Sequence, residues 1–385
     1  WEGISSIPTS FVETWVLKID TNLDTNAQNT LEKSIYKNIK SDGIQSAGIM
    51  MDPSTGKVLA LTGGMNYSKS QFNRALSENR QVGSTIKPFL YYSALENGFT
   101  PSTTFTSEKT NFSLDNGKTY SPKNYNDQYA NGPISMATAL AYSDNIYAVK
   151  THLFLGQNSL VNMLKRMGIN KEVKELPSLA LGAEEISLMD MMNAYATLAN
   201  EGNKINPHFI SKITDIEGNV LYEYKPTSEN ILNKSTVYVL NEMLTSTYSK
   251  EFIDYNYPTC YGINSKITKK YAIKTGTTDT DNLIFGYNKD LLVGMWTGYD
   301  DNKKVENNDS TNIKNAWVDT IETYLKDKKD NWYQTPSNVV GVAVNPLDGT
   351  IAKKNSKTTV QYYIKGTQPA SNKSLDEMVP TVKMQ

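Results

Sequence analysis

Hydrophobic and polar positions alternate in short stretches at both ends of the chain and follow a helical period between them. The alternation over Glu13–Ile19 predicts a strand, and Thr25–Lys40 has the periodicity of an amphipathic helix. Apolar stretches in Ala47–Thr62 flank a turn that carries Pro53 and Gly56. This pattern predicts a β-hairpin.

The middle of the chain is mostly helical by pattern. We expect helices over Gly83–Gly98, from Pro133 to about Leu153, and over Ile186–Ala199. The polar, turn-rich stretch Thr100–Asn131 predicts a long surface loop.

From Tyr271 onward, three apolar stretches separated by short turns predict neighbouring antiparallel strands. A helix over Asn315–Lys326 and short strands from about Val339 follow. Strands at both ends with helices between them predict an α/β (α+β) fold. We expect a central antiparallel sheet flanked by helices, closed by both ends of the chain, with a mostly helical subdomain.

Composition narrows the class of protein. The chain has 385 residues, of which 38% are hydrophobic and 21% charged, as in globular proteins. Its formal net charge of −1, without a basic patch, argues against nucleic-acid binding. No apolar run is long enough to span a membrane. Because the sequence begins at Trp1, we interpret it as a piece of a longer protein and expect membrane contact only through an anchor outside it.

Cysteine and histidine are scarce. Cys260 is the single cysteine, so an internal disulfide is excluded. The two histidines, His152 and His208, are far apart, and no group has the spacing of a zinc site. We expect neither a metal nor a cofactor.

Serine acyl transfer needs a nucleophile, a base, a proton donor and an oxyanion site. Two histidines and the lack of a G-x-S-x-G stretch disfavour a Ser-His-Asp triad, which leaves lysine as the base. The pattern S-x-x-K begins at Ser34, Ser54 and Ser84. Only Ser84 opens a predicted helix, on which Lys87 lies one turn further along the same face. Alone, the pattern also fits a serine helix cap beside a solvated lysine.

Two further motifs stand on other elements. Ser143-Asp144-Asn145 lies within the apolar helix predicted from Pro133, where polar side chains need partners; a local hydrogen-bond network or a helix kink explains it equally well. Lys274-Thr275-Gly276 continues into Thr277 on a predicted strand. The lysine and the hydroxyls suit a carboxylate, and the glycine permits close approach of backbone or substrate. An edge strand with a protective lysine is the alternative.

The order S-x-x-K, S-x-N, K-T-G resembles the transpeptidase domain of class A, bifunctional penicillin-binding proteins. Four longer stretches are also similar to that family: Gln71–Ala75, Ser121–Asn126, Leu176–Gly202 and Leu291–Asn302. One departure is the lack of a Trp soon after K-T-G-T-T, where this chain has Asn282–Phe285.

The resemblance implies a fold like that of penicillin-binding proteins and serine β-lactamases, and a role for each motif residue. Ser84 attacks the carbonyl of a D-Ala-D-Ala stem peptide, Lys87 takes its proton, and Ser143 relays a proton to the departing amine. Asn145 holds Lys87 and the substrate amide. The partners implied are peptidoglycan stem peptides ending in D-Ala-D-Ala and β-lactam antibiotics, at the outer face of the bacterial cell membrane.

The K-T-G strand completes the implied site. Lys274 adds a positive charge that it keeps, Thr275 and Thr277 bind the terminal carboxylate, and Gly276 lines the substrate. The backbone N–H groups of Ser84 and Thr277 form the oxyanion hole. A neutral Lys87 is required, since a free lysine with a pKa of ~10.4 is a poor base; burial and the charge of Lys274 favour that form.

The resemblance also implies a division of the chain. We expect a linker and first strand at residues 1–30, after an upstream glycosyltransferase domain. A transpeptidase domain at 31–330 and a β-rich extension at 338–385 follow. Two alternatives remain: a serine β-lactamase and a non-enzymatic β-lactam sensor. A β-lactamase needs a deacylating Glu, and Glu172 and Glu175 lie in a plausible stretch, but without an E-x-x-L-N pattern.

Overall fold

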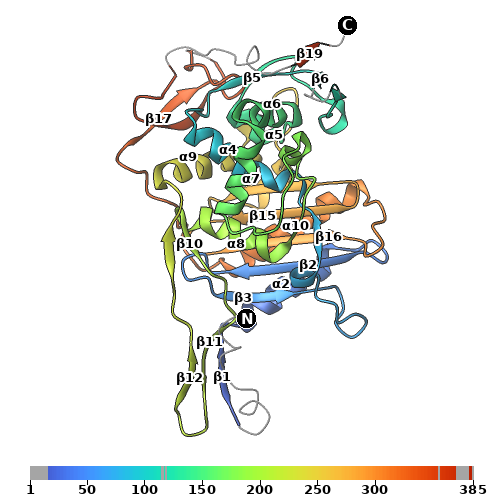
Figure 1. The fold of residues 1–385 in the computed structure, drawn as a ribbon, viewed down its shortest axis with the longest axis vertical. Coiled ribbons are helices and arrows are strands. Elements are labelled where there is room, and N and C mark those ends of the chain that lie inside the picture. Colours follow the sequence, from blue (N-terminus) through green and yellow to red (C-terminus); the bar gives the residue numbers. More distant parts are fainter. Residues whose placement is uncertain (1–15, 114–116, 118, 354–355, 370–380, 384–385) are drawn as a thin grey trace.

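The computed structural model describes residues 16–113, 117, 119–353, 356–369 and 381–383. Its centre is a five-stranded antiparallel sheet in the order β14-β15-β16-β2-β3 (Figure 1). The strands are β2 (Gln45–Met51), β3 (Val58–Thr62), β14 (Ala272–Thr277), β15 (Asp281–Tyr287) and β16 (Leu292–Gly298). Because β2 pairs with β16, the sheet is closed by both ends of the chain, and the predicted central antiparallel sheet is confirmed.

Helices cover both faces of this sheet. On one face, α2 (Thr25–Asn38) and α10 (Asn307–Tyr324) pack together and enclose an apolar core. Trp317 of α10 lies so close to β15 that a Cβ on Gly286 would be 2.2 Å from its ring, which explains the glycine there. On the other face, α8 (Leu188–Ala199) joins the sheet to the helical subdomain.

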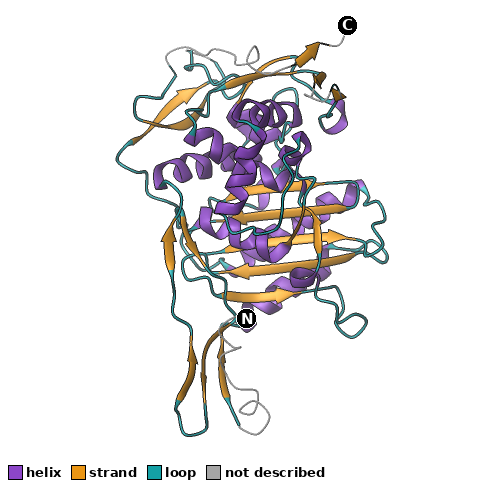
Figure 2. Ribbon diagram, viewed as in Figure 1, coloured by secondary structure: helices purple, strands orange, loops and turns teal. Residues whose placement is uncertain are grey.

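The helical subdomain stands above the sheet in Figure 2. Its helices are α4 (Lys87–Glu96), α5 (Met136–Tyr142), α6 (Asn145–Leu155), α7 (Gln157–Arg166) and α9 (Lys234–Leu244). A short 3₁₀ turn, Gly83–Ile86, precedes α4. The helix predicted over Gly83–Gly98 is therefore present, with a tighter first turn.

Two predictions for the middle of the chain are wrong. The helix expected from Pro133 to Leu153 begins as a strand, β8 (Gly132–Ser135). It then breaks between α5 and α6, because Asp144 caps α6 by accepting a hydrogen bond from the Tyr147 N–H (2.8 Å). The stretch predicted as a loop contains β5 (Thr104–Ser107), β6 (Thr110–Ser113) and β7 (Thr119–Tyr120). These strands are short and rich in Thr and Ser. Pairing stabilises them: β5 pairs with β8, and β6 pairs with both β7 and the distant strand β19.

Helix bounds also differ at the C-terminal side. The helix predicted to start at Asn315 starts at Asn307, because Glu306 and Asp309 form a capping box that extends it through a polar stretch. At the other end of the chain, β1 covers Lys18–Thr21, whereas part of the predicted Glu13–Ile19 strand lies outside the described residues.

Smaller sheets extend from the two ends of the molecule. A sheet of β1, β11 (Ile210–Thr214) and β12 (Val220–Glu223) lies at the bottom of Figure 1. The hairpin of β17 (Val339–Val344) and β18 (Thr359–Ile364) lies at the top, as does β19 (Thr381–Lys383). The remaining α-helix and strands are α3 (Arg74–Ser77), β4 (Asn79–Gln81) paired with β9 (Glu185–Ser187), and β10 (Asn203–Ile205) paired with β13 (Ser228–Asn230).

The division at residues 30, 330 and 338 stays a prediction, although residue 30 falls inside α2, which packs on the sheet. Among the helices of the described ranges, none combines the length and the apolar character that a membrane span needs.

Candidate active site

A cleft of about 820 Å³ lies between the helical subdomain and the edge strand β14. The three motifs meet there, since Ser84, Ser143, Asn145, Thr275 and Thr277 all line it. The other two serines with a lysine three positions on are elsewhere. Ser34 is buried in α2, and Ser54 is in the turn between β2 and β3, where its hydroxyl donates to Asp52.

The turn that carries Ser84 is held between two glycines. Gly83 has a φ of +53°, and its N–H donates to the Gly182 carbonyl (3.0 Å). A Cβ on Gly182 would be 1.9 Å from the Gly83 oxygen, and one on Gly276 would be 2.6 Å from the Val82 oxygen. Of the two uses foreseen for Gly276, close approach of backbone is therefore confirmed, and its contact with substrate stays a prediction.

Lys87 and Lys274 are both fully buried behind the cleft wall. The Lys87 amine donates to the Ser143 carbonyl and to Asn145 Oδ1, both at 2.7 Å, with longer contacts to the Asp144 carbonyl (3.2 Å) and Ser143 Oγ (3.4 Å). A neutral amine has two N–H groups, which suffice for the two short bonds.

Burial is also the main influence on the protonation of both lysines. It lowers the pKa of Lys87 well below that of a free lysine; the positive charge of Lys274 lowers it further, and Asp144 opposes the shift. Burial lowers the pKa of Lys274 to about 7. This pKa places the change of charge of Lys274 near neutral pH, and the expectation that Lys274 keeps its charge stays a prediction.

Ser143 lies between the two amines. Its hydroxyl is 3.0 Å from Lys274 Nζ and 3.4 Å from Lys87 Nζ. The residue adopts a left-handed backbone conformation (φ 57°, ψ 41°), which costs a non-glycine residue on the order of 1–3 kcal/mol. This conformation ends α5 and turns the hydroxyl toward both lysines, an arrangement suited to passing a proton along a chain of three groups.

Sequence reasoning missed the buried network that fixes this break. Asp144 Oδ2 accepts from Asn124 Nδ2 (2.6 Å) and from the Ser107 hydroxyl (2.5 Å), and Asn124 Oδ1 accepts from the Asn145 N–H (2.7 Å). The Asn145 amide also donates to the Lys123 carbonyl (2.7 Å). The stretch Ser121–Asn126 contributes to the family resemblance, but its sequence gives no sign of this packing.

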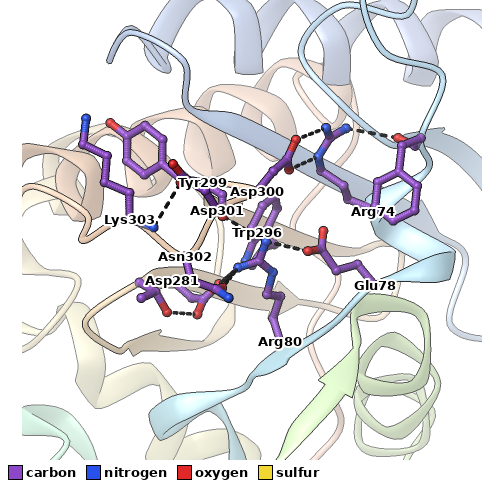
Figure 3. A network of polar contacts seen from close by, with 12 residues as sticks. Arg74, Glu78, Arg80, Asp281, Trp296, Tyr299, Asp300, Asp301, Asn302 and Lys303 are labelled. Atoms are coloured by element: carbon purple, nitrogen blue, oxygen red, sulfur yellow. Dashed lines mark hydrogen bonds and ion pairs between the residues drawn. The ribbon is translucent and has the colours of Figure 1, made fainter.

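A second network joins the strand before Ser84 to the turn after K-T-G-T (Figure 3). Arg80 lies over the Trp296 ring, donates to the Tyr299 carbonyl (2.9 Å) and lies 3.6 Å from Asp281. Asp281 accepts from the Trp296 indole N–H (2.8 Å) and the Thr280 hydroxyl (2.5 Å). Because Asp281 opens β15, Arg80 fixes the end of the hairpin that carries K-T-G relative to the turn that carries Ser84.

The same figure shows a second arginine, from the stretch Gln71–Ala75. Arg74 makes a bidentate ion pair with Asp300, with Nε to Oδ1 at 2.7 Å and Nη2 to Oδ2 at 2.5 Å. Its side chain is only 2% exposed. The segment from Arg74 to Arg80, which leads to Ser84, is therefore attached at both ends to the residues that follow β16.

Other candidate groups lie away from the cleft. Glu172 and Glu175 are exposed and do not line it. No group of His, Cys, Asp or Glu within the described ranges is arranged to hold a metal ion. A separate hollow of about 620 Å³ lies between α2 and the loop at residues 63–73, and none of the predicted site residues lines it.

Comparison with known proteins assigns the family. The family described as "Penicillin binding protein transpeptidase domain" matches residues 46–307, which include every predicted site residue. The chain belongs to this family. The resemblance predicted from the three motifs is confirmed, as is the fold class.

Individual relatives agree with this assignment. Penicillin-binding protein 2D of Bacillus subtilis is 43% identical over 364 residues, which cover 94% of this chain and 53% of that protein. Penicillin-binding protein 1A of Aquifex aeolicus is 32% identical, covering 85% of this chain and 44% of that protein. The chain thus spans about half the length of the curated relatives it matches.

Two solved structures share the fold. Penicillin-binding protein 1A from Haemophilus influenzae superposes with a TM-score of 0.77 at 27% identity, over 86% of this chain and 55% of that one. The PonA1 protein from Mycobacterium tuberculosis, solved in complex with penicillin V, gives a TM-score of 0.74 at 22% identity, over 87% of this chain and 92% of that one.

Proposed function

We propose that this chain is a D,D-transpeptidase that cross-links peptidoglycan stem peptides through an acyl-enzyme on Ser84, and that β-lactams acylate the same serine. The observation that carries the proposal is the cleft that Ser84 and Ser143 both line, with the Ser143 hydroxyl in contact with two buried lysine amines. We place this activity at the outer face of the bacterial cell membrane, where the stem peptides are.

In the acylation step, Ser84 Oγ attacks the carbonyl between the two terminal D-Ala residues, and its proton passes to the neutral amine of Lys87. The oxyanion that forms accepts hydrogen bonds from the backbone N–H groups of Ser84 and Thr277. When the C–N bond breaks, the Ser143 hydroxyl gives its proton to the departing amine and regains one from Lys87. The balance is one ester bond formed and one peptide bond broken.

In the second step, the amine of a neighbouring stem peptide attacks the ester carbonyl. Its proton returns through the same groups to Ser84 Oγ, the ester breaks, and a new peptide bond joins the two stems. Thr275 and Thr277 hold the carboxylate of the donor, and Lys274 attracts it when charged. Asn145 keeps the Lys87 amine in place through its 2.7 Å contact.

The labelled position and the lifetime of the label test this proposal. We expect a fluorescent penicillin to modify Ser84 alone, located by mass spectrometry of the digested adduct. We also expect slow release of the acyl group, because neither Glu172 nor Glu175, the two glutamates considered as deacylating groups, lines the cleft. An adduct on Ser34 or Ser54 would refute the proposal, and release of many molecules per second would favour a β-lactamase.

The pKa of Lys274 predicts a pH dependence. Its folded-state pKa of about 7 lies below that of a free lysine, so its charge is present at acid pH and is lost as the pH rises through about 7. We expect the second-order rate of acylation by penicillin to fall over that range, because the carboxylate loses an attracting charge. In Lys274→Arg the charge persists, and the alkaline fall should disappear. A parent rate that stays constant across neutral pH would contradict this role.

A further inference from the structure

One buried polar side chain of the cleft has no role in the mechanism above. Asn282 of β15 lines the cleft and is 1% exposed, and neither its amide nitrogen nor its carbonyl oxygen has a hydrogen-bond partner in the part of the chain that the structure describes. Buried polar side chains in folded proteins are nearly always hydrogen-bonded. An unpartnered carboxamide buried in the lining of the cleft is therefore a group for which a ligand could supply the contact.

The sheet register places this carboxamide beside the predicted carboxylate site. Asn282 is directly opposite Thr277 on the neighbouring antiparallel strand, so the two side chains share a face with Cβ atoms ~4.5–5.5 Å apart. Thr275 lies two residues along on the same face. A carboxylate held by Thr277 is thus within reach of the Asn282 amide.

Helix α10 forms the wall of the cleft on the side toward which Asn282 lies. Ile284, two residues after Asn282, packs in one apolar cluster with Trp317, so this face of the sheet points toward α10. The α10 residues that line the cleft are Asn307, Ser310, Thr311 and Lys314, which follow one helix face.

Both basic and acidic residues line this part of the cleft. Lys314 ends the polar helix face, and its amine donates to the Thr259 carbonyl (3.2 Å) on the cleft rim. Asp279 and Glu306 also line the cleft, and Glu306 caps α10. Asp281, adjacent to Asn282, is occupied by Arg80, Trp296 and Thr280 and leaves no free carboxylate at this point.

We infer that Asn282 and Thr277 bind the same group of the substrate, the terminal carboxylate of the acyl donor. The side-chain amide of Asn282 donates a hydrogen bond to that carboxylate. The inference rests on the proposed function and extends it to donor specificity. A carboxamide that is already buried and unpartnered needs no desolvation when the carboxylate arrives, and it gains a charge-assisted bond. The site should therefore select donors that carry a free carboxylate.

The test compares donors with and without that carboxylate. The second-order acylation rates of a penicillin and of its methyl ester are measured for the parent, Asn282→Asp and Asn282→Ala. Asn193→Ala serves as the control, because Asn193 also has an unpartnered carboxamide oxygen but does not line the cleft. Thermal unfolding of each variant confirms that it is folded.

We expect Asn282→Asp, which puts like charges together, to lower the rate with the acid by about 10- to 100-fold and to leave the rate with the ester unchanged. Asn282→Ala should lower the acid-to-ester ratio by a smaller factor, and Asn193→Ala should leave it at the parent value. Equal slowing of both donors, or an unchanged ratio in both Asn282 variants, would overturn the inference. Failure of the parent to form an adduct at Ser84 would instead overturn the proposed function.

Discussion

Replacement of Lys87 by arginine is expected to lower the second-order rate of acylation by penicillin by roughly 10²–10⁴, the usual contribution of a general base. The reason is the protonation state. Burial and the charge of Lys274 hold the pKa of Lys87 far below that of a free lysine, so its amine can accept the Ser84 proton. A guanidinium keeps its proton in a protein and cannot do so.

Lys274→Arg is the matched control for this experiment, because it makes the same chemical change at the other buried lysine of the site. Arginine retains the positive charge at this position, so we expect Lys274→Arg to keep part of the acylation rate. The expected loss of rate is one to two powers of ten at most, about the effect of one charge-assisted contact. Both rates are measured by stopped-flow or gel labelling after thermal unfolding confirms the fold. If Lys87→Arg reacts at near the parent rate, Lys87 is not the base.

Gly182→Ala should have the second large effect, although the residue carries no reactive group. The new methyl would lie 1.9 Å from the Gly83 carbonyl oxygen, a backbone atom that cannot rotate away. Either the turn that carries Gly182 or the turn that carries Ser84, which are hydrogen-bonded to each other, must therefore shift. A displacement of the order of 1 Å in a reacting group costs roughly 10²-fold in rate, and we expect acylation to fall by about that factor.

The control for this substitution is Gly218→Ala. Gly218 also has a positive φ, +89° against +74° for Gly182, but a Cβ added to it would meet no atom within 4 Å, and it is in the distant β11–β12 turn. Both variants share the cost of an alanine at positive φ, so the difference between them isolates the clash. Equal acylation rates in the two variants would show that the contact with Gly83 does not position the nucleophile.

Local pattern predicted the elements that carry the chemistry. The hairpin at residues 45–62, the helix after Ser84 and the strands from residue 272 follow from alternation, helical period and turn residues. The three motifs could be placed on these elements, and the structure brings Ser84, Ser143 and Thr277 into one cleft. This part succeeded for S-x-x-K and K-T-G, which lie at the start of a helix and on one strand, whereas S-x-N spans the junction of α5 and α6.

The helix break at Ser143 could not be predicted in the same way. Helical periodicity runs through Ser143-Asp144-Asn145, and nothing nearby in the sequence requires a left-handed residue. The break depends on Asp144 bonding to Asn124 and Ser107, which are 20 and 37 positions away. Likewise, Arg80 meets the Tyr299 carbonyl from 219 positions away. Such contacts arise from the tertiary fold and leave no local signal.

The pairing of β2 with β16 has a consequence for how the molecule folds. Ser46 and Trp296 are hydrogen-bonded partners 250 positions apart, so the middle of the sheet can form only after the chain has been made as far as β16. Contacts between such distant segments make folding slow, since a long loop must close before they form. Because β14 joins the sheet through β15 and β16, the cleft wall is completed at the same late stage. Penicillin labelling of a nascent or refolding chain would therefore report the closure of the sheet, and we expect fragments that end before β16 to stay unlabelled.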